Sequence, residues 1–194
     1  MSARRAGVDL RLATAGDAAG IRAIYAPFVR DTWVSFEADV PTVEEVARRI
    51  EAARPTFPWL LADADGTVAG YAYASAHRGR TAYQWSVEVS VYVAETYRRR
   101  GLARALYGAL VDVLRLQGFA NAYVGIALPN AASVGIHEAM GFEPVGVYRG
   151  VGYKMGAWRD VGWWALRLGD GAAPDPPRTL DAVAEAVAAR LSAA

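Results

Sequence analysis

A glutamate in the middle of a strand-like segment is the first residue of the sequence with the chemistry of a catalytic group. Glu88 lies in the strictly alternating segment 84–93, QWSVEVSVYV. A charged residue is unfavourable in the interior of a strand and therefore needs an explanation. A carboxylate placed there could accept a proton from a nucleophile, directly or through water. The alternative is an ordinary carboxylate on a solvated sheet face, which the alternation also allows.

A histidine in a short helical segment is the second residue with the chemistry of a catalytic group. His137 stands seven residues after Asn130, which is expected to cap a helix that runs through Met140. Imidazole changes charge near neutral pH and can serve as acid or base. The alternative is a helix-surface histidine favoured by the negative end of the helix dipole, and the residues alone favour this alternative. The other histidine, His77, is expected to be structural or exposed.

An arginine-rich turn between a strand and a helix is the third feature. The apolar stretch 91–93 is followed by the segment 98–103, RRRGLA, and then by an amphipathic helical pattern. Free N–H groups and the dipole at a helix start favour an anion, and small residues let a ligand approach the backbone. The segment matches neither common nucleotide-binding glycine motif. A basic first turn on a surface helix is the alternative, but arginine there opposes the dipole, so the pattern favours a phosphate site.

Alternating strand and helix patterns must position these groups. Strands are expected at 8–12, 59–63, 68–76, 84–93, 122–128, 145–153 and 161–168, with the turn DADG at 63–66. Helices are expected from the caps Thr14 and Thr42 to near Arg30 and Pro55, and at 98–118 and 130–140. Strands dominate the end of the chain, which indicates an α+β or mixed three-layer domain over 8–168. A linker at 169–178 and an Ala-rich amphipathic helix at 179–194 follow. That helix could dock on the domain, extend a dimer or stay mobile.

Composition narrows the function classes. The 194 residues suit one domain, and a formal net charge of +1 gives no reason to expect nucleic acid or an anionic membrane as partner. The chain has no cysteine and two histidines, too few for an ordinary histidine metal site. Neither a secretory signal nor a 20-residue apolar span is present, so we expect a soluble cytoplasmic protein without a metal.

The motifs resemble a known family. R-x-x-G-x-A at 98–103 resembles the acetyl-CoA signature of GNAT acetyltransferases, and NAAS at 130–133 with HE at 137–138 resembles their second cofactor motif. The segments AYQWSVEVSVYV, GIALPNAASVGIHEAMGF and GYKMGAWRDVGWWAL resemble the phosphinothricin and methionine sulfone/sulfoximine N-acetyltransferases. The resemblance covers about residues 8 to 168. It implies the GNAT fold, a mostly antiparallel twisted sheet flanked by helices.

The resemblance implies a co-substrate, acetyl-CoA, and two catalytic residues. The residues implied to bind acetyl-CoA are Val91, Tyr92, Val93, Arg98, Arg99, Arg100, Gly101, Leu102, Ala103, Asn130 and Ser133. The pantetheine arm would add to the edge of the strand at 91–93, which a bulge near 88–90 could splay from its neighbour. Glu88 would be the base. His137, where many GNAT enzymes have tyrosine, would protonate the thiolate or act as a second base. The oxyanion donor would be a backbone N–H near Val91 or Tyr92.

The resemblance also implies an acceptor and a partner. Phe36, Arg78, Arg80 and Tyr83 would bind a small amino-acid-like molecule, since guanidinium groups pair well with carboxylate or phosphinate. The family implies a homodimer, and we expect Trp158, Trp163 and Trp164 in the core or a dimer interface rather than against ligand. Two alternatives remain: a GNAT protein or peptide N-acetyltransferase, and a non-catalytic acyl-CoA-binding module. The sequence leaves the physiological acceptor open.

Overall fold

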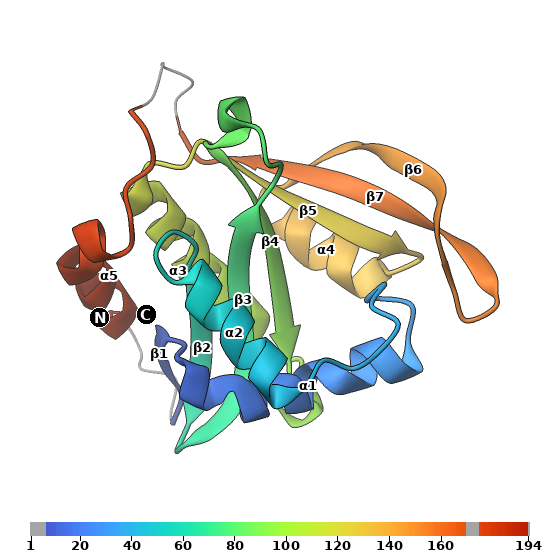
Figure 1. Cartoon of the computed structure of the whole chain (residues 1–194), viewed down its shortest axis with the longest axis horizontal. Helices are drawn as coiled ribbons and strands as arrows, with labels where there is room; N and C mark the ends of the chain where they lie inside the picture. The colour runs from blue at the N-terminus through green and yellow to red at the C-terminus, as the bar shows by residue number, and fades with distance from the viewer. Residues whose placement is uncertain (1–6, 170–174, 194) are drawn as a thin grey trace.

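A computed structural model describes residues 7–169 and 175–193 of the chain (Figure 1). Its main elements are β1 (Asp9–Leu12), α1 (Ala18–Asp31), α2 (Val43–Ala53), β2 (Trp59–Ala64), β3 (Thr67–Ala76), β4 (Ser86–Val93), α3 (Leu102–Gln117), β5 (Asn121–Leu128), α4 (Ala131–Ala139), β6 (Glu143–Lys154), β7 (Ala157–Arg167) and α5 (Ala184–Ser192). Short 3-10 turns η1 (Ala15–Asp17), η2 (Thr81–Tyr83), η3 (Glu95–Tyr97) and η4 (Asp181–Val183) lie between them. The predicted α+β class is confirmed.

One seven-stranded sheet forms the middle layer, in the order β1-β2-β3-β4-β5-β7-β6. All neighbours are antiparallel except β4 and β5, which are parallel. Helices α1 and α2 cover one face of the sheet, and α3 covers the other (Figure 1). The two faces bury separate apolar clusters, because alternate side chains of each strand point to opposite sides.

Local sequence signals explain the turns and helix starts. Asp65 and Gly66 both adopt positive φ, +51° and +82°, as a two-residue hairpin between β2 and β3 requires, so the predicted turn is confirmed. The cap predictions are also confirmed: the Thr42 hydroxyl accepts from the Glu45 N–H, and the Asn130 side chain accepts from the Ser133 N–H. The capping box of Thr14 and Asp17 is present.

The helix expected at 98–118 begins four residues later than predicted, at Leu102. Arg99 has φ +59° and Gly101 has φ +73°, and left-handed residues cannot continue a right-handed helix. The arginines therefore lie in an exposed turn ahead of the helix.

The C-terminal helix packs on the domain. Leu180, Val183, Val187 and Leu191 are buried in the cluster under α3, and the Arg190 guanidinium pairs with Asp112 of α3, with an Nε–Oδ2 distance of 2.6 Å. Of the predicted linker 169–178, residues 170–174 lie outside the described residues, as does Ala194 of the predicted helix. Among the three alternatives for this helix, the structure has the docked one.

Candidate active site

A cleft opens where β4 and β5 part. The two strands pair only from Ser86–Asn121 to Glu88–Tyr123, although β4 continues to Val93 and β5 to Leu128. On its other side β4 pairs with β3 in unbroken register from Val87 to Val93. The bulge that we expected near 88–90 is therefore wrong. The pairing with β5 ends at Glu88, which leaves one edge of β4 free beyond that residue.

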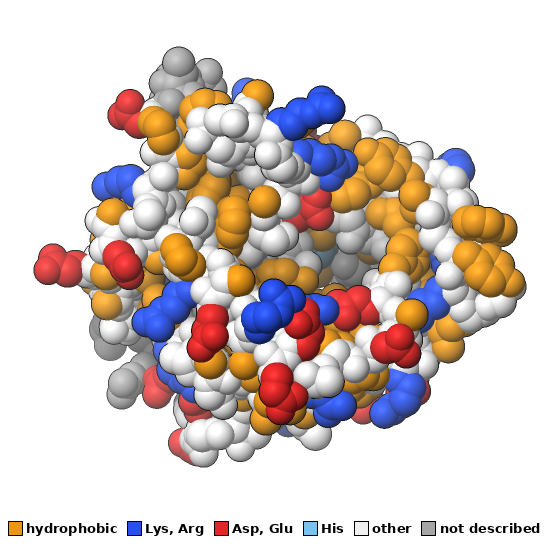
Figure 2. Space-filling view, in the orientation of Figure 1, with side chains coloured by type: hydrophobic (Ala, Val, Ile, Leu, Met, Phe, Trp, Pro, Cys, Tyr) orange, Lys and Arg blue, Asp and Glu red, His pale blue; other side chains and the backbone are white. Residues whose placement is uncertain are grey.

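Two pockets occupy this cleft and share Val34, Ser90, Gly125 and Ala127 as walls. The main pocket has a volume of about 440 Å³. Its other lining residues are Phe36, Tyr73, Ser75, Glu88, Val89, Tyr148, Val151, Val161 and Trp163. The inner pocket, of about 70 Å³, is lined in addition by Val91, Tyr92, Tyr107, Val124, Ile126, Asn130, Ser133 and His137. Figure 2 shows the hollow in the surface, with hydrophobic side chains on its β6–β7 side.

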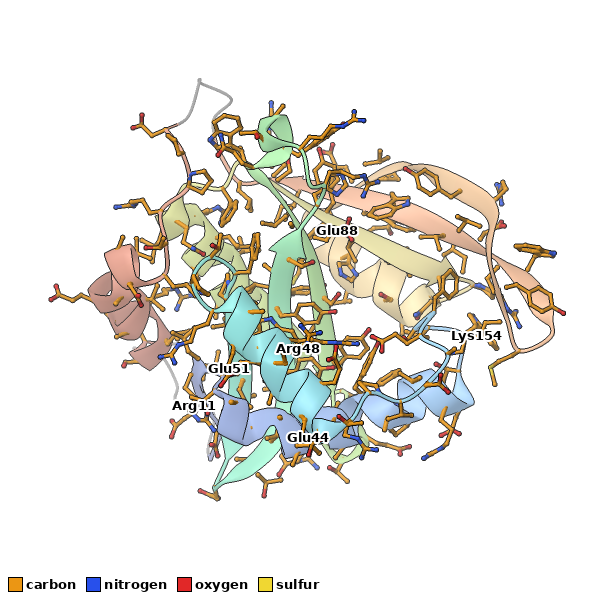
Figure 3. All side chains as sticks on the ribbon, viewed as in Figure 1. Arg11, Glu44, Arg48, Glu51, Glu88 and Lys154 are labelled. Atoms are coloured by element: carbon orange, nitrogen blue, oxygen red, sulfur yellow. The ribbon has the colours of Figure 1, made fainter. Side chains whose placement is uncertain are left out.

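Glu88 lies in the main pocket with two partners on one oxygen. Its Oε1 atom is 3.1 Å from Nδ1 of His77 and 3.2 Å from a terminal nitrogen of Arg78. Its side chain is one-third exposed, so it is neither buried nor fully solvated. Figure 3 places Glu88 on β4, above the opening between β4 and β5. The solvated-face alternative does not describe this position, because the carboxylate has specific donors inside a cleft.

His137 is almost fully buried at the inner pocket, so the helix-surface alternative is wrong. Its Nδ1 lies 2.6 Å from the Ser133 carbonyl oxygen, which can only accept, so Nδ1 carries a proton. Nε2 lies 2.8 Å from the Tyr107 hydroxyl. Burial lowers the pKa of His137 below its usual value and raises that of Tyr107 well above its own. A neutral imidazole therefore accepts the hydrogen bond of a neutral phenol.

The arginine-rich turn stands at the end of β4. The N–H groups of the first turn of α3 have no partner earlier in the helix, and the left-handed residues Arg99 and Gly101 shape the turn ahead of them. Arg98 is held by the Val93 carbonyl, with an Nε–O distance of 3.4 Å, and lies 5.4 Å from the centre of the Phe28 ring. Of the residues predicted to bind the co-substrate, Val91, Tyr92, Asn130 and Ser133 line the inner pocket, and the turn follows the end of β4.

The residues predicted to bind an acceptor are only partly brought together. Phe36 lines the main pocket, and Arg78 reaches its rim through Glu88 and the Trp163 ring. Arg80 and Tyr83 lie exposed at η2 and are not among the residues described as lining the pocket.

Three residues of the cleft were missed or misplaced by sequence reasoning. Tyr107 lies within the amphipathic segment that forms α3, and nothing in the sequence singled it out. His77, expected to be structural or exposed, is largely buried and contacts Glu88 directly, which the sequence did not indicate. Trp163 lines the main pocket and so is not a core residue, whereas Trp164 is 7% exposed and packs in the core. Adjacent strand residues point to opposite faces, which explains the difference.

Comparison with known proteins decides the family. Residues 10–163 match the GNAT acetyltransferase domain. The chain belongs to the GNAT acetyltransferase family. It is 39% identical to a phosphinothricin N-acetyltransferase of Streptomyces viridochromogenes, over 95% of this chain and 100% of the relative. It is 37% identical to an L-methionine sulfoximine/L-methionine sulfone acetyltransferase of Pseudomonas paraeruginosa, over 88% of this chain and 97% of the relative.

A solved structure agrees with the family. The phosphinothricin acetyltransferase of Sinorhizobium meliloti in complex with acetyl-CoA superposes with a TM-score of 0.82 at 35% identity, covering 88% of this chain and 93% of that one. The sequence-based identification, the GNAT fold and the acetyltransferase class are thereby confirmed. The predicted co-substrate is the molecule held by that relative.

Neither a metal-binding cluster nor a membrane-spanning helix occurs among the described residues. No group of three or more acidic or histidine side chains lies close enough together to hold a metal ion in ranges 7–169 and 175–193. In the same ranges, the helices are too short or too polar to cross a membrane.

Proposed function

We propose that this acetyltransferase moves the acetyl group of acetyl-CoA to the amino group of a small amino-acid-like acceptor. The observation that carries the proposal is one continuous cleft. Glu88 stands at its wide end, the Tyr107–His137 pair at its narrow end, and the arginine-rich turn lies beyond the end of β4. An acyl transfer to an amine needs a base for the amine and an acid for the departing thiolate, and each end of the cleft has one such group.

The free edge of β4 fits the donor. Acetyl-CoA has a pantetheine arm with amides, which can pair with the unpaired backbone of residues 91–93 as an added strand would. Its diphosphate suits the N–H groups at 102–103 and the cations of the turn. Asn130 and Ser133 face the same narrow pocket, but their side-chain and backbone atoms already cap α4, so their role is to shape the wall.

Glu88 is the base at the wide end. An acceptor ammonium must lose a proton before its nitrogen can attack the acetyl carbonyl, and a carboxylate can take it directly or through water. Oε1 is occupied by His77 and Arg78, while no hydrogen bond to Oε2 occurs among the described residues. Oε2 is therefore the oxygen that receives the proton.

The narrow end supplies a proton to the departing thiolate. His137 cannot give one directly, because its Nδ1–H is held by a carbonyl and its Nε2 has no proton. The Tyr107 hydroxyl can turn from Nε2 and donate. We therefore assign Tyr107 as the acid and His137 as the residue that orients it, which refines the role expected for His137.

The main pocket suits a small acceptor. About 440 Å³ accommodates an amino acid with a short polar side chain, and mostly apolar walls would hold its methylene groups. Arg78, 45% exposed and close to Glu88, can pair with an acidic head group. Phosphinothricin, methionine sulfone and methionine sulfoximine have this form, so resistance to such compounds in the cytoplasm is part of the proposal.

A homodimer is the assembly that we propose. The outer strand β6 and its hairpin expose an apolar patch made of Val145, Val147, Tyr148, Val151, Tyr153, Met155 and Trp158. Monomers rarely expose large contiguous apolar areas. Tyr148 and Val151 also line the main pocket, so a second copy on this patch would close its rim. Light scattering should give twice the chain mass, and Trp158→Glu should give the monomer; a monomeric wild type would refute the assignment.

Thiol release from acetyl-CoA tests the reaction. Wild type and Glu88→Gln are compared with phosphinothricin, methionine sulfone, methionine sulfoximine, free amino acids and basic peptides. We expect turnover on the first three, and a fall of about 100-fold or more in kcat for the variant. Turnover on peptides alone would favour the protein acetyltransferase alternative. Binding of acetyl-CoA without turnover on any acceptor would favour the non-catalytic module.

A further inference from the structure

The contact between His77 and Glu88 has a role that the proposed reaction leaves unassigned. His77 is the first residue after β3, and the antiparallel register pairs Ala76 with Val87 of β4. The His77 N–H donates to the Ser86 carbonyl at 3.4 Å. The backbone pairing therefore holds the imidazole beside the carboxylate, with 3.1 Å between Nδ1 and Oε1.

Aromatic rings fix the orientation of the imidazole. It stacks on Tyr123 of β5, with 4.5 Å between ring centres and 19° between planes. The edges of Tyr83 and Trp163 close two more sides at 6.0 and 6.1 Å. Only 14% of the His77 side chain is exposed. A ring held in this way can present one nitrogen in one direction without an entropic cost at each turnover.

The proton on the shared hydrogen bond belongs to the imidazole. An ionised carboxylate can only accept, so Nδ1 is the donor and Oε1 the acceptor. Arg78 donates to the same oxygen, but its side chain is 45% exposed and flexible. An acidic acceptor can draw Arg78 away, whereas His77 stays in place between its aromatic neighbours.

We propose that His77 is a positioning residue for Glu88: it holds Oε1 so that Oε2 faces the acceptor amine throughout the reaction. The inference rests on the proposed function, in which Glu88 is the base. Without the hydrogen bond the Glu88 side chain would sample several rotamers, and fewer of them would place Oε2 at the amine. Loss of His77 should therefore lower kcat and leave the binding of acetyl-CoA unchanged.

Paired substitutions test the role. His77→Phe keeps a ring against Tyr123 but removes the donor, and His77→Asn keeps a donor near the position of Nδ1 but removes the ring. Steady-state kinetics on the best acceptor should give a roughly tenfold fall in kcat for His77→Phe, with the KM for acetyl-CoA within twofold of wild type. His77→Asn should recover part of the lost kcat, which a role in packing alone would not produce.

A double variant separates this inference from the reaction itself. If His77 acts through Glu88, His77→Phe should cost nothing further in the Glu88→Gln background. A full tenfold loss there, or a kcat for His77→Phe equal to wild type, overturns the positioning role while the function stands. An unaffected Glu88→Gln enzyme instead overturns the proposed base. Thermal melts accompany each variant, and His77→Leu replaces His77→Phe in the same cycle if the latter does not fold.

Discussion

Lys154 fastens the loop between α1 and α2 to the end of β6, and its removal is the sharpest test of how the main pocket is built. The ammonium donates to three backbone carbonyls, at 2.6 Å to Val29, 2.7 Å to Ser35 and 2.8 Å to Glu37. This uses all three of its donors. Figure 3 shows Lys154 at the edge where the β6–β7 hairpin meets that loop. The loop carries Val34 and Phe36, both walls of the main pocket.

The use of lysine at position 154 indicates that this contact requires an ammonium group. Lys154 is the one lysine in the sequence, and the other 20 of its 21 Lys and Arg residues are arginines. A compact ammonium can point donors at three converging carbonyls, whereas the planar guanidinium fork cannot. Burial lowers the pKa of Lys154, so part of the gain from the three bonds is offset by lost hydration.

We expect Lys154→Met to destabilise the protein by about 2–3 kcal/mol. Each bond from a charged donor contributes about 1.5–3 kcal/mol. Part of this loss is recovered in the variant, because the freed carbonyls can bind water and no ammonium has to give up its hydration. At about 2–4 °C per kcal/mol for a chain of this size, the melting temperature should fall by about 4–12 °C. Looser placement of Phe36 should raise the KM for the acceptor about tenfold and change that for acetyl-CoA little.

Differential scanning fluorimetry and acceptor titrations measure both effects. Arg149→Met is the matched control, because it removes an exposed ion pair with Asp160 from the same hairpin and should cost less than about 1 kcal/mol. Lys154→Arg keeps the charge and should still lose stability. A Lys154→Met enzyme with the melting temperature and acceptor KM of wild type would refute the role of Lys154 in holding the loop against β6. A fully stable Lys154→Arg enzyme would refute the argument from donor geometry.

Three further predictions follow from the buried groups. Tyr107→Phe should lower kcat about 100-fold in the thiol-release assay, since it removes the proposed acid; a kcat within threefold of wild type would reassign that role. Burial lowers the pKa of His137, so the unfolded chain binds its proton more tightly and folding stability should fall as pH drops below about 6.5, by at most about 1.4 kcal/mol per unit. Denaturant melts at pH 7.5 and 5.5 should show a smaller drop for His137→Gln than for wild type, and equal drops would contradict the assignment. Leu191→Ala should cost about 2–3 kcal/mol in the same melts with kcat unchanged, because α5 packs under α3 away from the cleft; an unchanged midpoint would mean that α5 adds no stability.

Local patterns were enough for the parts of the fold that local chemistry decides. Thr42 and Asn130 cap their helices by accepting the N–H three residues on, and the turn at 65–66 needs two residues with positive φ. These are interactions within four residues, so the sequence specifies them directly. The start of α3 was placed too early because arginine has good helix propensity. The backbone at Arg99 and Gly101 instead adopts the positive φ of a turn, which ends any helix there.

Contacts between distant residues were beyond that kind of reasoning. Tyr107 and His137 are 30 residues apart. His137 had a complete explanation alone, as a helix-surface residue, and nothing in the sequence set Tyr107 apart. The contact of His77 with Glu88 depends on the register of β3 against β4, which a nine-residue interval between the strands does not specify. Trp163 was expected in the core or a dimer interface, because the sequence does not show that the sheet opens beside it.

Under the proposed function, the hydrogen bonds of the cleft leave two atoms for the two proton transfers. Oε1 of Glu88 is held by two donors, and both nitrogens of His137 are engaged. Among the described residues no hydrogen bond reaches Oε2 of Glu88, and the Tyr107 hydroxyl is bonded to Nε2 of His137, from which it can turn toward a ligand. One faces the wide pocket and the other the narrow one. Under the proposed function, deprotonation of the amine and protonation of the thiolate therefore occur at separate ends of the cleft, so Glu88→Gln and Tyr107→Phe should alter different limbs of the pH–rate profile.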